Sequence, residues 1–285
     1  MGEFVEIVEV GPRDGLQNEP RPIPVAEKVA LINRLSRVGF RRIEAASFVS
    51  PRWVPQMAGS ADVMARIERF PGVIYSALTP NLRGFEDALE AGVDEVAVFA
   101  SASEGFSRAN INASIAESLA RFRSVTDAAG AANMPVRGYV SCVVDCPYDG
   151  PVAPEAVADV TAELLAMGCH EVSLGDTLGR ATPERVDAML GAVLEVAEAS
   201  DLAGHFHDTA GHAVENVMVA IGRGLRVFDA AVGGLGGCPY APGAAGNVAT
   251  GVLAEALEAR GFEHGLDLAL LSDAAGMAAS MRVGG

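Results

Sequence analysis

Two histidines separated by a single residue, His205 and His207, have a spacing that points directly to chemistry. In a β-strand, residues i and i+2 point to the same side, so both imidazoles would face one way and Phe206 the other. Two imidazoles on one side can bind a divalent metal ion together with ligands from neighbouring elements. They can equally form a hydrogen-bonded pair in a protein core. The HxH pattern alone leaves both interpretations open.

Other polar residues stand where apolar runs of the sequence end. Arg13 and Asp14 follow the first run, Glu44 ends the second, and Asp176 ends the sixth. An Asp-Gly pair is common in turns, and Asp176 or Asp208 could simply cap the helix that follows. If these run ends meet on one rim, however, a carboxylate, a guanidinium and two imidazoles form a metal-assisted site. We therefore favour the metal site over the core pair.

A glycine-rich segment, GGLGGCPYAPGAAGN, occupies residues 233–247, carries the thiol of Cys238 and ends at Asn247. One interpretation is a phosphate cradle, although the Gly-Lys-Ser of the Walker pattern is missing. The other is a mobile lid that brings Cys238 to the reaction, where a nearby cation would lower the pKa of the thiol from about 8.5. The alternative role for a cysteine is that of a small buried hydrophobe, which we expect for Cys142 and Cys169.

The single lysine, Lys28, falls on a predicted helix rather than at the end of a strand. A Schiff-base aldolase or a pyridoxal enzyme needs a lysine in its active site, so these classes are excluded. Of the other histidines, we expect His170 and His264 to be structural. His212, in the first turn of a helix after HFHDT, is close enough to the rim to touch a ligand but is more typically a solvated helix residue.

These residues must be positioned by an alternation of strands and helices. Eight short apolar runs rich in β-branched residues recur about every 32 residues, with helical periodicity between them. Val25, Val29, Ile32 and Leu35 share one helical face, and Thr182-Pro183 is a typical helix start. Eight even units predict an α/β fold, a (β/α)8 TIM barrel. The runs are residues 5–10, 41–46, 73–78, 94–100, 136–143, 171–175, 202–207 and 226–232.

No linker or low-complexity tract interrupts this series, so we expect a single domain over residues 1–285. Its C-terminal helices and tail would occupy roughly residues 247–285. Barrel active sites lie at the carboxyl ends of the strands, which is where the candidate residues stand.

Composition excludes several classes of protein. Half of the 285 residues are hydrophobic, enough for a large core. A net charge of -16 argues against a nucleic-acid surface, and any anionic ligand must meet a local basic patch. Four scattered cysteines without a CxxC pair predict reduced thiols. The sequence starts without a signal-peptide pattern and has no run of about 18 apolar residues, so we expect a cytoplasmic protein that contacts no membrane.

Six segments together point to one protein family: VGPRDGLQNE, IEAASFVSPRWVPQMA, VRGYVSCVVDCPYDG, EVSLGDT, HFHDT and GGLGGCPYAPGAAGNVAT. They resemble the 3-hydroxy-3-methylglutaryl-CoA lyase family, of the metal-dependent lyase and Claisen-synthase group of TIM barrels. The resemblance covers nearly the whole chain, and the glycine-rich segment is its most specific part.

The resemblance implies a role for each candidate residue. Arg13 would stabilise a thioester enolate, and Cys238 or His205 would protonate it. Asp14 or a base linked to the metal would remove the C3 hydroxyl proton of the acyl-CoA substrate. Glu44 and Asp176 would orient Arg13 and the ligands. The residues that would bind a divalent cation, Mg2+ or Mn2+, are Asp14, His205, His207 and Asn247. The products would be acetyl-CoA and acetoacetate.

The sequence departs from the family pattern at three positions. Ala210 stands where tyrosine is expected, His212 where glutamine is expected, and Gly251 where glutamate is expected. Loss of a ring at residue 210 would widen the acyl pocket, so we hypothesise that a larger C3 substituent is accepted.

Two alternatives belong to other classes. A Claisen synthase that joins acetyl-CoA to a 2-oxo acid shares the HxH and Arg-Asp pairs, but this chain leaves no room for the regulatory domain that such synthases append. A barrel that binds CoA esters without catalysis is the other. The family usually forms homodimers, and nothing in the sequence identifies the interface.

Overall fold

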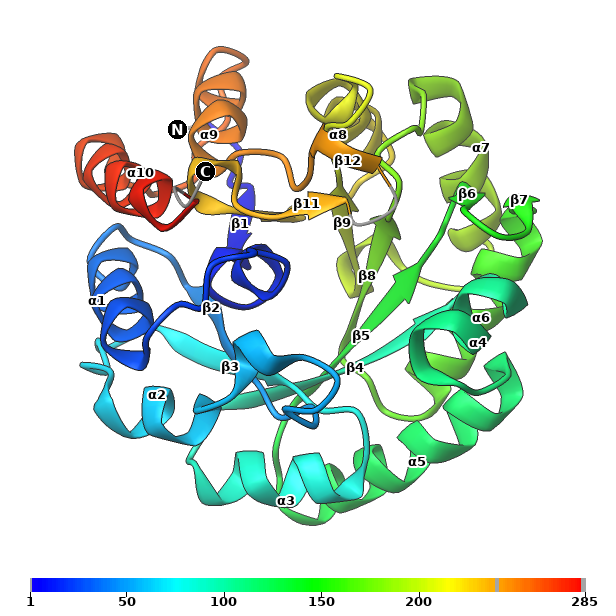
Figure 1. The fold of residues 1–285 in the computed structure, drawn as a ribbon. Coiled ribbons are helices and arrows are strands. Elements are labelled where there is room, and N and C mark those ends of the chain that lie inside the picture. Colours follow the sequence, from blue (N-terminus) through cyan, green and yellow to red (C-terminus); the bar gives the residue numbers. More distant parts are fainter. Residues whose placement is uncertain (1, 239–240, 283–285) are drawn as a thin grey trace.

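Eight parallel strands close into a barrel in the order β1-β10-β9-β8-β5-β4-β3-β2 (Figure 1). The structure is a computed structural model and describes residues 2–238 and 241–282, without the side chains of residues 237–245. Each strand begins within one residue of its predicted start, so the predicted TIM barrel is confirmed. The strands are β1 (Glu6–Glu9), β2 (Arg42–Ser47), β3 (Ile74–Leu78), β4 (Glu95–Ser101), β5 (Val136–Ser141), β8 (Glu171–Asp176), β9 (Leu202–Phe206) and β10 (Val227–Ala230).

Helices surround the barrel. Val29, Ile32 and Leu35 of α1 are buried, as the predicted apolar face requires. Pro183 is the first residue of α7, as predicted, and two helices follow β10. The helices are α1 (Val25–Leu35), α2 (Ser60–Arg66), α3 (Leu82–Glu90), α4 (Glu104–Ile111), α5 (Ile115–Ala131), α6 (Pro154–Ala166), α7 (Pro183–Val193), α8 (Ala213–Gly222), α9 (Thr250–Glu258) and α10 (Leu268–Arg282).

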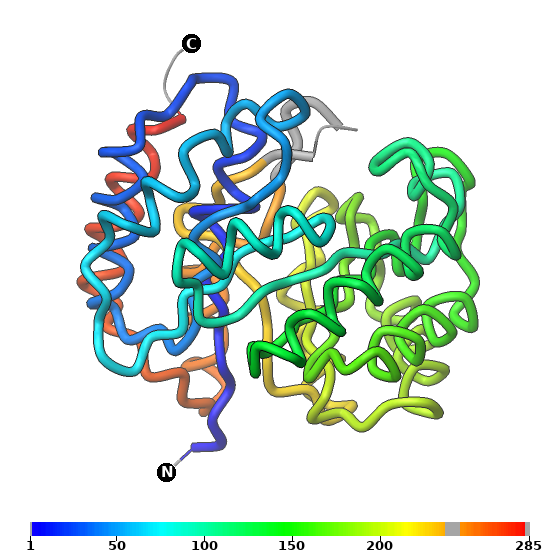
Figure 2. The backbone as a smooth tube through the Cα atoms, turned by 90° about the horizontal axis from the view of Figure 1, so that it is seen from below, coloured from blue at the N-terminus to red at the C-terminus, as the bar shows by residue number. Residues whose placement is uncertain are grey.

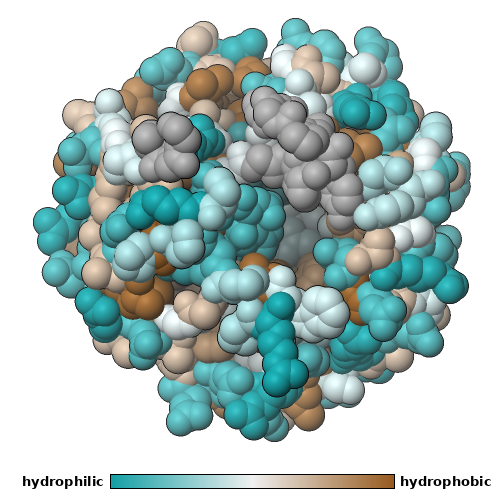
Figure 3. Space-filling view, in the orientation of Figure 1, coloured by the Kyte–Doolittle hydropathy of each residue, from teal (hydrophilic) through white to brown (hydrophobic). Residues whose placement is uncertain are grey.

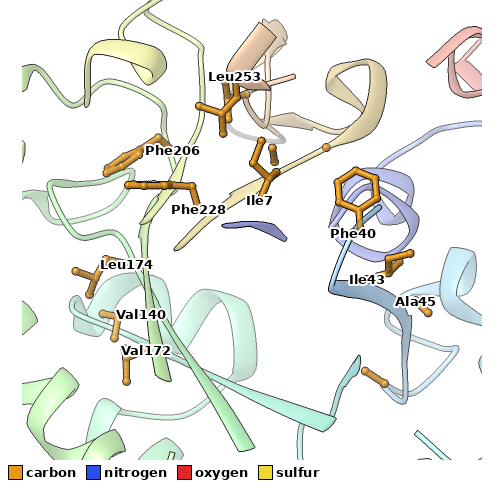
Figure 4. Packing of buried hydrophobic residues seen from close by; sticks show 14 of the residues in the cluster. Ile7, Phe40, Ile43, Ala45, Val140, Val172, Leu174, Phe206, Phe228 and Leu253 are labelled. Carbon is orange, nitrogen blue, oxygen red and sulfur yellow. The ribbon is translucent and has the colours of Figure 1, made fainter. Parts of the chain in front are cut away.

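The main core lies between the strands and the helices. Every second strand residue points outward, so Phe206 of β9 meets Phe228 of β10 while Val140 of β5 lies near Val172 of β8 (Figure 4). Gly204 leaves room for this packing, because a Cβ there would lie 2.7 Å from the Phe206 ring. Burial of each large apolar side chain contributes about 1.5–3 kcal/mol, so this layer holds the strand register firmly.

The alternate strand residues point into the barrel and are largely polar. Arg137, Glu171, Ser173 and Asp229 are buried there, below the two histidines of β9. A small apolar cluster of Leu78, Ala97 and Tyr139 forms another part of the lumen wall. The space-filling view along the barrel shows a hollow near the centre of the face that is turned to the reader (Figure 3).

Three local elements were not predicted. A single π-helical turn, η1 (Gly11–Gly15), follows β1. A short hairpin of β6 (Asp145–Cys146) and β7 (Gly150–Pro151) follows β5. The glycine-rich segment opens with the 3-10 turn η4 (Val232–Gly234) and continues as an antiparallel pair, β11 (Gly237–Cys238) with β12 (Ala241–Ala245).

The chain starts near one end of the barrel and finishes its last helix toward the other (Figure 2). None of the helices in the described part of the chain is long and apolar enough to cross a membrane.

Candidate metal centre and its surroundings

The turn after β1 brings Arg13 and Asp14 to the mouth of the barrel. The backbone N–H groups of both residues donate to the carbonyl of Val10, which fixes the turn. Arg13 Nε donates to Glu44 Oε2 at 2.7 Å, and Arg13 Nη2 lies 2.5 Å from the same oxygen. Arg13 Nη1 donates to Asp14 Oδ1 at 2.7 Å. The guanidinium therefore bridges the two carboxylates, and the predicted role of Glu44 in orienting Arg13 is consistent with this contact.

The two histidines at the carboxyl end of β9 lie on the side of the strand that faces the lumen, and their imidazoles contact each other. His205 Nε2 lies 3.2 Å from His207 Nε2 and 3.9 Å from Asp14 Oδ2. Both side chains are buried, and one donor atom from each of the three residues lies within 4.8 Å of the others. The geometric half of the HxH prediction is thus confirmed, with Asp14 as the third group.

Asn247, at the end of the glycine-rich segment, joins the same group. Its backbone forms an isolated antiparallel bridge with His207, and its Nδ2 donates to Asp14 Oδ2 at 2.8 Å. The side chain is 4% exposed. All four residues that the resemblance implied as metal ligands therefore lie together.

The charge states of these groups are strongly coupled. Burial raises the pKa of Asp14, but Arg13 and the two histidines outweigh it and lower the pKa to about 2. Burial and the neighbouring His205 lower the pKa of His207 to about 4. Burial also opposes the charged form of His205, but the hydrogen bond with Asp229 outweighs it and raises the pKa. The site thus presents a carboxylate beside imidazoles with opposite tendencies to bind a proton.

This donor set fits a divalent cation. Two imidazole nitrogens 3.2 Å apart and directed at each other are satisfied together either by a shared proton or by a cation. A carboxylate oxygen and an amide group complete a mixed nitrogen and oxygen set, which divalent ions of the Mg2+, Mn2+ and Zn2+ kind accept. The amide of Asn247 would turn to present its oxygen, since the oxygen and nitrogen ends of an amide have nearly the same shape.

The carboxylate of Asp229 orients His205 from below. Asp229 Oδ2 lies 3.0 Å from His205 Nδ1 and accepts from Ser173 Oγ at 2.8 Å. A carboxylate on the second ring nitrogen fixes which nitrogen faces a metal and raises the basicity of the imidazole. Burial opposes ionisation of Asp229, but Arg137 and His205 hold its pKa below the usual range.

Sequence reasoning missed Asp229, together with Arg137, Tyr139 and Ser173. A signal was present, because Asp229 interrupts the apolar run 226–232 and Arg137 the run 136–143. An ionisable residue within a buried barrel strand needs a partner, and the sequence did not tell us which strands would face each other.

Asp176 is the last residue of β8, and its role in orienting Arg13 and the ligands stays a prediction. It follows Val172 and Leu174 on the outward-facing side of β8, because side chains alternate along a strand. Its Oδ2 accepts from the backbone N–H of Ala181 at 2.9 Å. Within the described residues, the hydrogen bonds of Asp176 hold the loop that follows β8, while Arg13 pairs with Glu44 and Asp14. The alternative that Asp176 caps the following helix does not describe this contact, because Ala181 precedes the first residue of α7.

Four further residues from the sequence analysis remain, and the structure describes the side chains of three of them, Asp208, Ala210 and His212. The side chain of Cys238 lies outside the described residues. His212 immediately precedes α8 and contacts Glu215, and Asp208 accepts from the first N–H of that helix at 3.0 Å. Ala210 is exposed in the same loop.

Three residues that we set apart from the site lie elsewhere. Lys28 is buried on α1 and donates to the carbonyl of Gln56. His170, just before β8, lies 2.7 Å from Glu95, and His264 is buried and lies 3.2 Å from Glu258. These contacts agree with structural roles.

Comparison with known proteins supports the same family as the sequence resemblance. The HMGL-like family model matches residues 4–277. A Pseudomonas aeruginosa protein named 3-hydroxy-3-isohexenylglutaryl-CoA/hydroxy-methylglutaryl-CoA lyase is 56% identical over 95% of this chain and 90% of its own length.

Solved structures agree with these matches. The HMG-CoA lyase of Brucella melitensis superposes with a TM-score of 0.97 at 61% identity, covering 98% of this chain and 99% of that chain. An Acinetobacter baumannii HMG-CoA lyase solved with coenzyme A and 3-methylmalate gives a TM-score of 0.93 at 38% identity, covering 98% and 91% of the two chains. The chain is a carbon–carbon lyase and belongs to the HMGL-like family.

Proposed function

We propose that this lyase cleaves 3-hydroxy-3-methylglutaryl-CoA to acetyl-CoA and acetoacetate, the known reaction of its family, at the mouth of the barrel. The observation that carries the proposal is the convergence of Asp14, His205 and His207 within 4.8 Å, beside the guanidinium of Arg13. The ligands would be completed by Asn247, and the ion would be Mg2+ or Mn2+. A divalent cation bound there supplies Lewis-acid polarisation of the substrate oxygens.

Asp14 is the carboxylate that takes the proton from the C3 hydroxyl. Three carboxylates surround the site, and arginine pairs with each of them, but the side chains of Glu44 and Asp229 are only 1% and 0% exposed. The side chain of Asp14 is 16% exposed, so substrate can reach it. Accessibility therefore selects Asp14 for contact with the hydroxyl.

Arg13 and Cys238 complete the reaction. As the hydroxyl proton leaves, the C2–C3 bond breaks, C3 becomes the ketone carbon of acetoacetate, and the bonding electrons form the enolate of acetyl-CoA. Arg13, fixed by Glu44, donates to the enolate oxygen. Cys238 on the lid then gives a proton to the enolate carbon. The proton taken by Asp14 then returns to the Cys238 thiolate, so the cycle needs no external acid or oxidant.

Release of acetyl-CoA from the substrate, with Mn2+ or with chelator, tests this function. Metal-dependent release supports it, and release that is unaffected by a chelator would contradict it. Cys238→Ser should cut the rate strongly, whereas Cys169→Ser, which changes a cysteine buried outside the lumen, is the matched control.

A larger C3 substituent is a second candidate for the substrate. Ala210 is exposed three residues after His207, where a tyrosine would narrow the mouth. The Pseudomonas aeruginosa relative is named for an isohexenyl as well as a methyl substrate. We expect this chain to accept the longer acyl group, and Ala210→Tyr to lower kcat/KM for that group more than for the methyl substrate. Equal effects on both substrates would contradict the hypothesis.

We extend the proposal to four features that rest on sequence and resemblance. The segment 233–247 would act as a lid over the substrate within a single barrel domain, and the chain would work as a homodimer in the cytoplasm. Buried reduced cysteines, Cys142, Cys146 and Cys169, suit a reducing compartment. The mass of the purified protein in solution tests the dimer.

A further inference from the structure

Arg137 is the largest of the fully buried side chains that the structure describes, and the proposed chemistry does not use it. It lies on β5 inside the barrel and is 2% exposed. An arginine cannot lose its charge, and an unpaired buried charge is very costly, so its partners must be well defined. Those partners lead toward the metal ligands in one direction and toward Arg13 in the other.

The first branch leads to the histidines. Arg137 Nη2 lies 2.8 Å from Asp229 Oδ1. The other oxygen of that carboxylate lies 3.0 Å from His205 Nδ1 and also accepts from Ser173. Arg137 therefore fixes the plane of the carboxylate that turns His205 Nε2 toward His207 and Asp14.

The second branch leads to the other arginine. Arg137 Nη1 donates to the Tyr139 hydroxyl at 2.9 Å, and that hydroxyl donates to Glu44 Oε2 at 3.3 Å. The same Oε2 accepts from Arg13 Nε at 2.7 Å. The Tyr139 ring also lies near both guanidiniums, with its centroid 5.0 Å from Arg137 Cζ and 5.5 Å from Arg13 Cζ.

The third side of Arg137 is anchored away from the site. Its Nε donates to Glu171 Oε1 at 2.7 Å. Glu171 in turn accepts two hydrogen bonds from Arg42, at 2.9 and 3.0 Å, and Arg42 also pairs with Glu6. This anchor lets the planar guanidinium of Arg137 hold both branches in a fixed relative position.

We propose that Arg137 is a positioning residue that sets two parts of the site at once, His205 through Asp229 and Arg13 through Tyr139 and Glu44. Its polar contacts within the described structure are with Asp229, Tyr139 and Glu171 rather than with the proposed metal ligands. Lysine cannot replace it, because a single ammonium nitrogen cannot meet Asp229, Tyr139 and Glu171 from the positions of three guanidinium nitrogens. The inference rests on the proposed function for its catalytic readout, whereas its metal-binding readout is independent of activity.

The test measures Mn2+ affinity by calorimetry and kcat at saturating Mn2+, with the full chain. Asp229→Asn should weaken Mn2+ binding about 10- to 100-fold, as loss of an outer partner of a ligating histidine does. Tyr139→Phe should keep the Mn2+ affinity and lower kcat, because it cuts only the branch to Arg13. Arg137→Gln should do both, with kcat lowered by up to about 100-fold through misplacement of the reacting groups.

Arg42→Gln is the matched control. It removes another buried guanidinium that pairs with Glu171, but it keeps every contact of Arg137 itself, including the one with Glu171. If the role of Arg137 is merely structural, both arginine variants should be less stable than the wild type. The folded fraction of each variant should then have the wild-type Mn2+ affinity and the wild-type kcat. That result would overturn the inference.

If Arg137→Gln does not fold, Arg137→Lys takes its place. A folded lysine variant with wild-type Mn2+ affinity and wild-type kcat would equally overturn the inference. If the wild-type chain itself binds no Mn2+ and releases no acetyl-CoA, the proposed function fails, and this inference fails with it. The two failures are therefore distinguished by the wild-type measurement.

Discussion

His205 Nε2 and His207 Nε2 lie 3.2 Å apart, and both face the carboxylate of Asp14. Nothing else in the described structure places two imidazoles in contact. Strand geometry accounts for their common direction, and the turn at Gly11–Gly15 accounts for the position of Asp14. The charges of the two imidazoles and of the Asp14 carboxylate therefore influence one another at this point of the barrel mouth.

Divalent metal should stabilise the fold through this contact. A ligand that binds only the folded state adds about 2.7 kcal/mol to the free energy of unfolding at a concentration one hundred times its Kd. We expect that gain with Mn2+ for the wild-type chain and a loss of it in His205→Ala. Urea denaturation with Mn2+ and with chelator measures the gain. An equal gain in His205→Ala would place the metal elsewhere.

Arg13→Lys should reduce turnover with little effect on metal affinity. Lysine keeps the charge but loses the paired Nε and Nη2 contacts with Glu44, so the donor is no longer held toward the enolate. Loss of one positioned donor at a developing oxyanion lowers kcat by about 10²–10³-fold. Steady-state kinetics at saturating Mn2+ check the prediction.

Arg21→Lys serves as the control for that change. Arg21 pairs with Glu27 in a partly exposed contact, which contributes little. Its replacement should leave both kcat and Mn2+ affinity as in the wild type. A similar fall in kcat for the two variants would contradict a special role for Arg13.

The sequence predicted the frame of the site better than its interior. The starts of the strands followed from apolar runs with period two, and the common direction of His205 and His207 followed from the same rule. The partners of buried charges did not follow, because Arg137 on β5 and Asp229 on β10 meet only when the barrel has closed. The contact of Asp176 with the backbone of Ala181 did not follow either, because the sequence indicates a strand end but not the path of the loop after it.

Glu9 lies outside the lumen and supports the base of the glycine-rich segment. Its Oε1 accepts from the N–H groups of Gly11 and Val232, and its Oε2 accepts from Thr250 Oγ. The carboxyl group thus links β1 to both ends of the segment that would form the lid. Burial is the main cause that raises its pKa, to about 7.

The raised pKa of Glu9 predicts a pH dependence of stability. Between pH 4.5 and 7 the folded chain keeps a proton on Glu9 that the unfolded chain releases, so the free energy of unfolding falls as pH rises through this window. The total contribution is about 3 kcal/mol. Glu9→Gln cannot ionise, so its stability relative to wild type should improve from pH 4 to pH 8. Parallel stability curves for the two proteins in urea denaturation would contradict this assignment.

Replacement by alanine should change the free energy of unfolding in opposite directions at two glycines, Gly251 and Gly179. At Gly251, in the first turn of α9, a Cβ would meet no atom within 4 Å. Alanine there should raise the free energy of unfolding by about 0.5–1 kcal/mol, because it restricts the unfolded chain without strain in the folded one. A loss of stability in Gly251→Ala would contradict this prediction. It would show that the backbone at residue 251, where the family pattern has glutamate, requires glycine.

Gly179→Ala should instead be destabilising and should weaken metal binding. Gly179 has a φ of +62°, and a Cβ there would lie 2.8 Å from His207 Cβ and 2.7 Å from Thr209 Oγ1. The left-handed conformation costs an alanine about 1–2 kcal/mol, and the crowded Cβ must displace His207 or its own loop. Because His207 is a proposed ligand, Mn2+ affinity should fall together with stability. Calorimetric titration checks this, and a variant that loses stability but keeps wild-type Mn2+ affinity would show that the loop, and not the imidazole, gives way.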